Sequence, residues 1–198
     1  MKILGICCSP REGMATRYAL DKCLAAVKNG YPEIHTEVID LSSVKVGGCL
    51  VCGQCMEGLE CSQKDDFNGL IHHLTDARLA GLIVSTPVYF GSMSSQCKAF
   101  LDRCVMFRRN GFLLRDKVGG VIAVGGFKNG GQEIAIQSVQ AAMLVQDMII
   151  VGDGQPGAHF GGALWSGHPE GVEEDIQGLE TVRNLGRRVA EVALKLNG

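Results

Sequence analysis

"LAGLIVSTPVYF", residues 79–90, is the stretch that indicates the fold of this chain. It is a continuous apolar run that gives way to Thr86 and Pro87. Apolar residues without alternation are typical of a strand that is covered on both faces, as in a parallel sheet. We therefore predict a buried strand here, with a loop at its carboxyl end.

The same pattern recurs along the chain on both sides of this strand. Further strands are predicted at 2–8, 34–41, 118–126 and 148–153. Helices are predicted at 15–29, 65–77, 94–107, 130–146 and roughly 172–196. Strands that alternate with helices predict an α/β fold, a doubly wound, five-stranded parallel sheet with helices on both faces. We expect residues 1–198 to form a single domain.

The bulk composition narrows the class of protein. The formal net charge is −2, and acidic and basic residues are interspersed. The chain therefore lacks the cluster of basic residues that is typical of nucleic-acid-binding proteins. No apolar run approaches the roughly 18 residues of a membrane span, and no secretory signal is visible. The odd count of nine cysteines suits a reducing compartment. We expect a cytoplasmic protein that binds neither nucleic acid nor membrane.

Three predicted strands end in loops that suit a flavin mononucleotide (FMN). "CCSPREGMAT" (7–16) leads into a helix, and a helix N-terminus with added hydroxyls and an arginine suits a phosphate, although Ser9 and Thr16 are equally compatible with simple helix capping. "STPVYFGS" (85–92) and "AVGGFKNGGQE" (123–133) offer aromatic side chains and glycines for a planar ring. The expected FMN contacts are Ser9, Arg11, Gly13, Thr16, Thr86, Pro87, Val88, Tyr89, Phe90, Gly91, Gly125, Gly126, Asn129 and Gly130.

A cysteine-rich loop, residues 47–66, follows the second predicted strand. "GGCLVCGQCMEGLECSQKDD" holds four thiols in thirteen residues, with the spacing C-x2-C-x2-C-x5-C. A disulfide staple, a structural zinc and a redox metal cluster are the three alternatives. A chain of this length buries enough surface to fold without staples, which weakens the first alternative.

With these motifs in order, the chain resembles the iron-sulfur flavoproteins of the flavodoxin-like, NADPH-dependent FMN reductase superfamily. The stretches that carry the resemblance run nearly the full length: "SPREG", the four-cysteine motif, "PVYFGS", "KAFLDR", "FRRNGF", "KVGG", "GGFKNGGQE", "VGD" and "HFGG". The resemblance implies FMN and a 4Fe–4S cluster held by Cys49, Cys52, Cys55 and Cys61. It also implies a homodimer or homotetramer in which the cluster of one subunit approaches the flavin of another.

The chain departs from this family pattern in its first loop. Cys8 stands where the superfamily usually has glycine before Ser9, and Ala15 stands where an asparagine is common. The location of a phosphate site is therefore better supported than its individual contacts.

The cysteine spacing itself favours a cluster. A cubane offers four iron corners to four thiolates, and a short loop with successive x2 gaps reaches neighbouring corners. Zinc sites more often use two separated C-x2-C knuckles or two additional histidines. A C-x-x-C redox pair needs only two of the four thiols. Both alternatives stay open, the second because cluster-free relatives exist.

These features predict a redox flavoprotein that passes single electrons through the cluster to FMN and on to an acceptor. The family resemblance implies a one-electron donor such as ferredoxin, and oxygen or peroxide as an acceptor. The alternatives are a cluster-free NAD(P)H-dependent FMN or quinone reductase and a flavin-free zinc module. No catalytic acid, base or nucleophile is predicted. A run of cations is a candidate docking patch for an acidic electron carrier: Arg103, Arg108, Arg109, Arg115 and Lys117.

Overall fold

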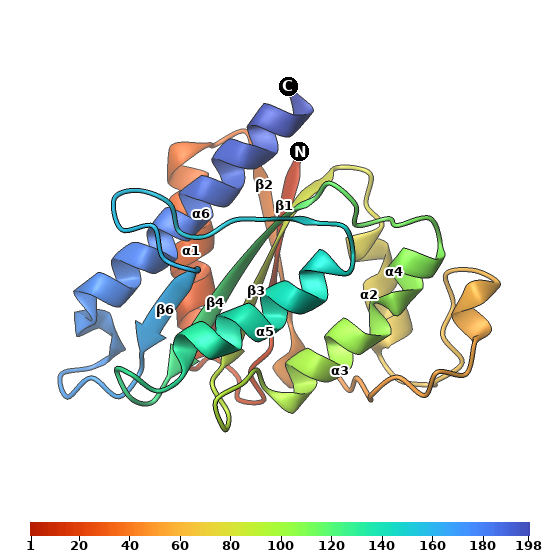
Figure 1. The fold of residues 1–198 in the computed structure, drawn as a ribbon, viewed down its shortest axis with the longest axis horizontal. Helices are drawn as coiled ribbons and strands as arrows, with labels where there is room; N and C mark the ends of the chain where they lie inside the picture. Colours follow the sequence, from red (N-terminus) through yellow and green to blue (C-terminus); the bar gives the residue numbers. More distant parts are fainter.

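The computed structural model describes all residues from 1 to 198, and a parallel sheet forms its centre (Figure 1). The strands are β1 (Lys2–Cys7), β2 (His35–Asp40), β3 (Leu79–Pro87), β4 (Val118–Gly125), β5 (Ile149–Ile150) and β6 (Gly162–Trp165). The strand order is β2-β1-β3-β4-β5, and β6 also pairs with β4. All of these pairings are parallel, as the sequence predicts.

Helices cover both faces of the sheet. They are α1 (Ala15–Gly30), α2 (Phe67–Leu74), α3 (Ser95–Arg103), α4 (Val105–Arg109), α5 (Gln132–Leu144) and α6 (Ile176–Asn197). One core cluster joins the sheet to α1 and α6, and the other joins it to α2, α3, α4 and α5. None of these helices is both long and apolar enough to cross a bilayer.

Glycine allows the helices to pack closely on the sheet. A side chain at Gly120 of β4 would place its Cβ 2.8 Å from Val189 of α6. Gly5 of β1 faces Leu20 and Leu24 of α1 in the same way, with hypothetical Cβ contacts of 3.0 Å. A Cβ at either position would be unusually close to the helix, so glycine here lets α1 and α6 pack against the strands that carry the first and third loops.

The sheet has six strands rather than the predicted five. The predicted strand 148–153 pairs with Val118 and Gly119 over only two residues, and β6 then pairs with the later part of β4, from Ile122 to Gly125. Gly152, Gly154 and Pro156 follow β5 in the connection to β6. Glycine and proline interrupt a ladder, so the single predicted strand is replaced by two short ones beside β4.

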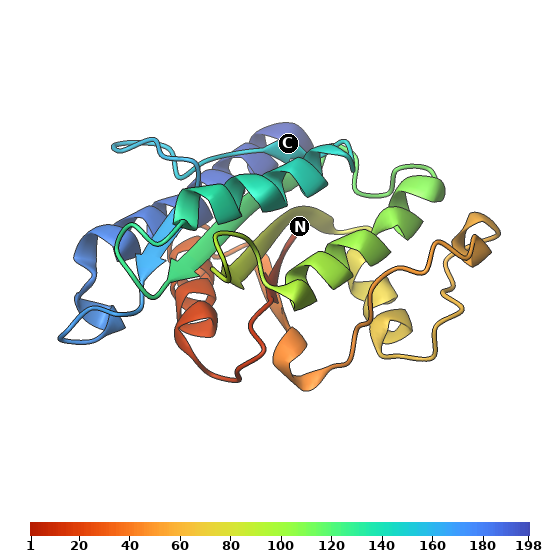
Figure 2. The same cartoon turned by 60° about the horizontal axis from the view of Figure 1, so that its bottom comes forward.

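The predicted helix 94–107 is also two helices. α3 ends at Arg103 and α4 begins at Val105, with Cys104 between them donating its backbone N–H to the carbonyls of both Phe100 and Leu101. The cysteine-rich loop contains one short 3-10 helix, Gln54–Met56. Figure 2 shows this loop as an arm beside α3 and α4, on the opposite side of the molecule from β6.

Candidate functional site

The first predicted loop connects β1 to α1 and is anchored at its start. The Cys8 N–H donates to the Ser85 carbonyl at 2.8 Å, and the Ser94 hydroxyl donates to the Cys8 carbonyl at 2.7 Å. The buried Ser9 hydroxyl accepts a hydrogen bond from the Arg11 N–H at 3.1 Å. The loop is thus shaped by internal hydrogen bonds, while the Arg11 side chain stays exposed.

The N-terminus of α1 has no side-chain cap. Met14 occupies the N-cap position and offers no acceptor, so neither Ser9 nor Thr16 caps this helix. In α3, by contrast, the Ser94 hydroxyl accepts a hydrogen bond from the Cys97 N–H at 3.1 Å. The free N–H groups in the first turn of α1, together with the helix dipole, are suited to an anion such as a phosphate.

The second loop leaves β3 and is tied to the neighbouring strand. The Val88 N–H donates to the Val124 carbonyl at 2.9 Å, which holds the loop against β4. Beyond Val88 the side chains turn outward, and Phe90 is fully exposed at a backbone φ of 49°. A left-handed conformation is unfavourable for a phenylalanine, so its presence at an exposed loop tip indicates a local constraint.

The third loop leaves β4 and approaches the second loop closely. A Cβ at Gly131, where φ is 92°, would lie 3.3 Å from the Cα of Gly91. The buried Gln132 fixes this loop from inside, because its amide accepts from the Gly130 N–H at 2.8 Å and donates to the Phe127 carbonyl at 2.6 Å. Glycine is required where the two loops meet.

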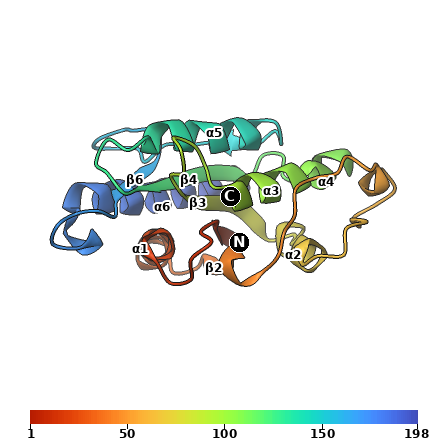
Figure 3. The ribbon, with the colours of Figure 1, turned by 90° about the horizontal axis from the view of Figure 1, so that it is seen from below.

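The three loops lie at the same carboxyl edge of the sheet, which Figure 3 shows from below. The buried members of the predicted FMN set are Ser9, Thr16, Thr86, Pro87 and Gly125. The half-buried members are Val88, Gly91 and Gly130. The exposed members are Arg11, Gly13, Tyr89, Phe90, Gly126 and Asn129. An uncapped helix, a glycine-to-glycine approach and exposed aromatic rings together fit a phosphate and a planar ring system.

A cavity of about 700 Å³ lies beside the third loop, among α5, β6 and the start of α6. Asn129 is the one predicted FMN residue that lines it, so this cavity is not the predicted FMN groove. Its wall includes Asp153, which is 2% exposed and hydrogen-bonded to both the backbone and the ring of His159. Asp153 was not predicted as a site residue from the sequence. The only sequence signal that could have indicated it is its position between Gly152 and Gly154.

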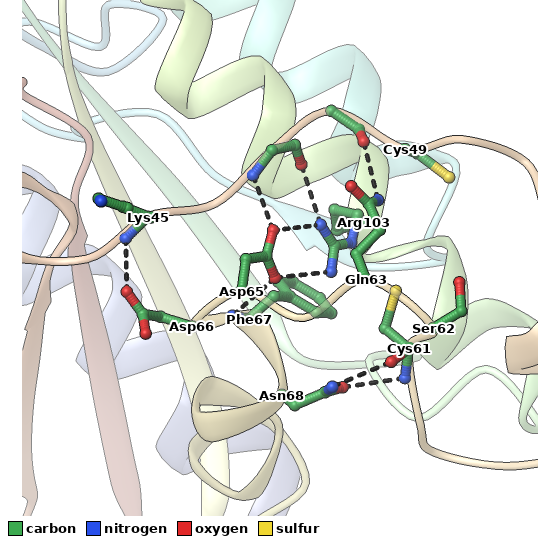
Figure 4. A network of polar contacts seen from close by, with 12 residues as sticks. Lys45, Cys49, Cys61, Ser62, Gln63, Asp65, Asp66, Phe67, Asn68 and Arg103 are labelled. Atoms are coloured by element: carbon green, nitrogen blue, oxygen red, sulfur yellow. Dashed lines mark hydrogen bonds and ion pairs between the residues drawn. The ribbon is translucent and has the colours of Figure 1, made fainter.

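The two ends of the cysteine-rich loop meet at Arg103 of α3 (Figure 4). Arg103 forms a two-armed ion pair with Asp65, at 2.8 and 3.0 Å, and also donates to the Gly47 carbonyl at 3.1 Å. Its guanidinium lies 4.6 Å from the centre of the Phe67 ring. Asp65 in turn accepts a hydrogen bond from the Gly47 N–H at 2.9 Å. This side chain therefore closes the loop at both of its ends.

The network shifts the ionisation of both partners. Burial alone would lower the pKa of Arg103, but Asp65 and the neighbouring Cys61 thiol outweigh it, and the pKa of Arg103 is raised. Burial alone would raise the pKa of Asp65, but Arg103 and the N–H groups of Gly47 and Phe67 lower it. Both groups are thus held in their charged forms.

Arg103 is consequently unavailable as part of a docking patch, which corrects the interpretation of the cation run. Its side chain is 1% exposed. Arg115 is exposed, but it forms ion pairs with Asp116 and Asp147. The local charge pattern could not reveal this, because Asp65 is 38 residues from Arg103 along the chain.

Two asparagines position individual cysteines. The Asn110 amide donates to the Cys55 carbonyl at 2.9 Å. Asn68 makes a paired contact with Cys61, accepting from its N–H at 2.9 Å and donating to its carbonyl at 3.0 Å. The backbone of the loop is therefore fixed to α4 and α2 at two of the four cysteines.

All four cysteines line one small hollow of about 20 Å³, together with Arg103 and Arg109. Cys55 is buried, Cys52 is exposed, and the other two are intermediate. The four sulfurs do not converge into a ready metal site, because no three histidine, cysteine or acidic side chains in the structure stand at ligand spacing. Figure 4 shows the Cys49 sulfur directed away from the Arg103 network.

The chemistry of this hollow nevertheless fits a thiolate-ligated cluster. All nine cysteines are free, and no carboxylate or histidine lines the hollow. The Nε atom of Arg103 is buried without a hydrogen-bond partner. A buried unpaired donor beside four thiols is the feature expected where sulfur acceptors are supplied by a bound group.

The exposed thiol of Cys52 differs in acidity from the buried thiols of Cys7 and Cys23. The pKa of Cys52 is lowered by its hydrogen bond with the Ser62 hydroxyl, at 3.0 Å, and by hydrogen bonds with backbone N–H groups. Burial raises the pKa of Cys7 to about 11 and that of Cys23 still higher. Cys7, Cys23, Cys97 and Cys104 are buried in the core, as the sequence predicts. A thiolate, the metal-binding form, is therefore more readily formed at Cys52 than at Cys7 or Cys23.

Comparison with known proteins places these features in a family. The profile of the NADPH-dependent FMN reductase family matches residues 1–163. An iron-sulfur flavoprotein of Methanocaldococcus jannaschii is 42% identical over 97% of both chains. An iron-sulfur flavoprotein of Methanosarcina thermophila is 38% identical over 97% of this chain and 95% of its own.

Solved structures agree on the fold. The structure of RosB, with a bound formylriboflavin phosphate intermediate, matches all of this chain and 80% of its own length with a TM-score of 0.74 at 17% identity. A WrbA-like flavodoxin of Agrobacterium tumefaciens matches 98% of this chain and 96% of its own, with a TM-score of 0.64 at 20% identity. The fold is therefore flavodoxin-like, and the chain belongs to the NADPH-dependent FMN reductase family and, within it, to the iron-sulfur flavoproteins.

Proposed function

We propose that this redox flavoprotein binds FMN at the carboxyl edge of its sheet and a 4Fe–4S cluster in its cysteine-rich loop. In this proposal electrons arrive singly from a donor such as ferredoxin, pass through the cluster to FMN, and leave to an acceptor such as oxygen or peroxide. The observation that carries it is the hollow lined by four free thiols and two arginines on a chain of this family. The cluster supplies one-electron chemistry, and FMN exchanges one or two electrons.

The chain's own residues would bind and orient the flavin. The free N–H groups of α1 and the exposed Arg11 are placed to hold the phosphate. Gly91 and Gly131 bring the second and third loops close together, and these two loops would flank the flavin ring. Tyr89, 43% exposed, and Phe90 supply aromatic faces at its mouth.

The cysteine-rich loop would hold its metal through a small closing movement. Arg103 and Asp65 fix both ends of the loop, and Asn110 fixes Cys55. The exposed Cys52 is the thiol with the greatest freedom to move toward the others. The fixed ends of the loop and the four thiol donors support a site whose ligands converge only when its metal binds.

The surface around the hollow supports an acidic electron carrier as the partner. Arg108 and Arg109 are exposed at the end of α4. Leu50 and Val51, at the rim of the hollow, are 71% and 74% exposed. Exposed apolar side chains flanked by cations are suited to a transient protein contact that is steered by charge.

A homodimer or homotetramer is part of the proposal. Figures 1 and 2 show the cysteine-rich loop on the opposite side of the sheet from the third loop. A second copy could therefore bring a cysteine-rich loop closer to the flavin edge than its own chain does. The free state of all nine thiols supports a reducing, cytoplasmic setting.

A cluster-free NAD(P)H-dependent FMN or quinone reductase is the second candidate. The unconverged sulfurs and the cavity beside the third loop favour it, because a hydride donor needs room next to the flavin. Anaerobic purification followed by flavin, iron and sulfide analysis separates the two. The proposal predicts about one FMN and four iron atoms per chain. If the protein contains FMN but no iron, even after reconstitution, the first candidate is rejected and the cluster-free reductase is favoured.

A further inference from the structure

Arg109 contacts the most buried of the four loop cysteines. It is the last residue of α4, and its Nη1 atom donates to the Cys55 sulfur at 3.2 Å. The next residue, Asn110, holds the Cys55 carbonyl at 2.9 Å. Two adjacent residues at the C-terminal end of α4 therefore fix both the sulfur and the backbone of Cys55. The contact is built into the packing of α4 on the loop.

The charge of Arg109 is not compensated at this site. Arg103, the other cation that lines the hollow, is paired with Asp65 through two hydrogen bonds. Arg109 forms no ion pair, and no carboxylate lines the hollow. Arg109 is therefore the uncompensated positive charge that lines the hollow beside the four thiols.

A cation at this position has a defined effect on electron affinity. A cluster held by thiolates becomes more negative when it takes up an electron. A guanidinium that donates to a ligand sulfur therefore stabilises the reduced form more than the oxidised form. Hydrogen bonds to ligand sulfurs and local charge are among the protein's means of tuning such a centre.

We propose that Arg109 sets the potential at which the cysteine-rich loop accepts an electron, through its hydrogen bond and charge at the Cys55 sulfur. This inference rests on the proposed function, since it requires the cluster. Arg109 acts through Cys55 and is therefore a positioning residue. Its neighbour Arg108 offers a matched control, because its guanidinium lies 5.3 Å from the Phe112 ring and contacts no cysteine.

The test compares wild type with Arg109→Gln, Arg109→Lys and Arg108→Gln. Each protein is prepared anaerobically with its iron and sulfide measured, and the cluster is titrated with dithionite and mediators while electron paramagnetic resonance follows reduction. Arg109→Gln is expected to weaken reduction about tenfold, which is 59 mV for one electron. Arg109→Lys keeps the charge without the forked geometry and should shift less. Arg108→Gln should not shift.

The flavin potential in the same samples is an internal control, because Arg109, at the end of α4, contacts the cysteine-rich loop and is not among the predicted FMN residues. If Arg109→Gln loses its iron, the test rests on Arg109→Lys. A cluster potential in Arg109→Lys equal to that of wild type then overturns the inference. A full cluster with equal potentials in all four proteins also overturns it. Equal shifts in the Arg108 and Arg109 variants would show a general surface-charge effect and overturn the specific contact. Wild type without iron would instead reject the proposed function.

Discussion

The buried Arg103 and the half-buried Asp65 form a two-armed ion pair, with Nη1 at 2.8 Å from Oδ2 and Nη2 at 3.0 Å from Oδ1. The pair joins α3 to the end of the cysteine-rich loop, and the Gly47 carbonyl joins the start of the loop to the same guanidinium. One side chain thus defines the frame in which the four cysteines lie.

Removing this guanidinium should destabilise the chain strongly. Arg103→Met leaves the Asp65 carboxylate without its partner, and losing hydrogen bonds between charged groups at a part-buried site costs about 1.5–3 kcal/mol. The free energy of unfolding in urea measures the loss. Lys98→Met is the matched control, because its pair with Asp102 is exposed and is worth about 0–1 kcal/mol. If Arg103→Met lowers the free energy of unfolding no more than Lys98→Met does, Arg103 does not hold the cysteine-rich loop in place.

The same pair predicts a pH dependence. The folded pKa of Asp65 is lowered because Arg103 outweighs the effect of burial, so its contribution to stability is fully present above the unfolded value of about 4. That contribution is lost as the pH falls below about 4 and through the lowered folded pKa.

Asp65→Asn should therefore flatten the acid limb of the stability profile, measured as the free energy of unfolding between about pH 7 and pH 2. Asp102→Asn, at an exposed pair, should leave that limb nearly unchanged. If the free energy of unfolding of Asp65→Asn falls as steeply at acid pH as that of wild type, then Arg103 does not lower the pKa of Asp65 in the folded protein.

How far the sequence anticipates this structure depends on the range of the contacts involved. The apolar runs of β1 and β4 predict their bounds within one residue, and that of β3 predicts its start but runs three residues past its end. A strand buried on both faces carries its signal locally. β6 was missed because its four residues pair only with distant β4, and Gly161 and Gly162 precede its apolar part. Its existence depends on a neighbour rather than on its own pattern.

The candidate site divides in the same way. The four cysteines and the three loops follow from local motifs, and the structure places them in one hollow and at one sheet edge. The residues that frame the cysteines, Arg103, Asn68 and Asn110, could not be predicted. Each acts across the space between elements, and an arginine within a run of cations gives no sign that it is buried.

Phosphate binding should depend on the exposed cation of the first loop. Arg11→Gln removes a charged donor near the free N–H groups of α1 and should weaken FMN binding about tenfold. Fluorescence titration of the apoprotein with FMN measures this. Lys22→Gln, on the same helix but stacked over the Tyr18 ring, makes the same change in net charge and should leave the affinity unchanged. Equal losses in the two variants would rule out a local phosphate contact.

Electron delivery by an acidic carrier should depend on Arg108. Arg108→Gln is expected to slow reduction by ferredoxin several-fold at low ionic strength, and the difference should shrink in high salt because charge steering is screened. Stopped-flow measurement of flavin bleaching gives the rates. Arg115→Gln is the control, since Asp116 and Asp147 already offset its charge. Unchanged rates for Arg108→Gln at low salt would reject the docking face.

The central claim is that one chain carries both a flavin and a cluster in its cysteine-rich loop. An anaerobic reductive titration of the holoprotein, with FMN and iron determined on the same sample, tests it most directly. The account predicts an uptake of three electrons per FMN, two by the flavin and one by the cluster, with a resonance signal from the reduced cluster. An uptake of two electrons per FMN by reconstituted protein, without that signal, would contradict it.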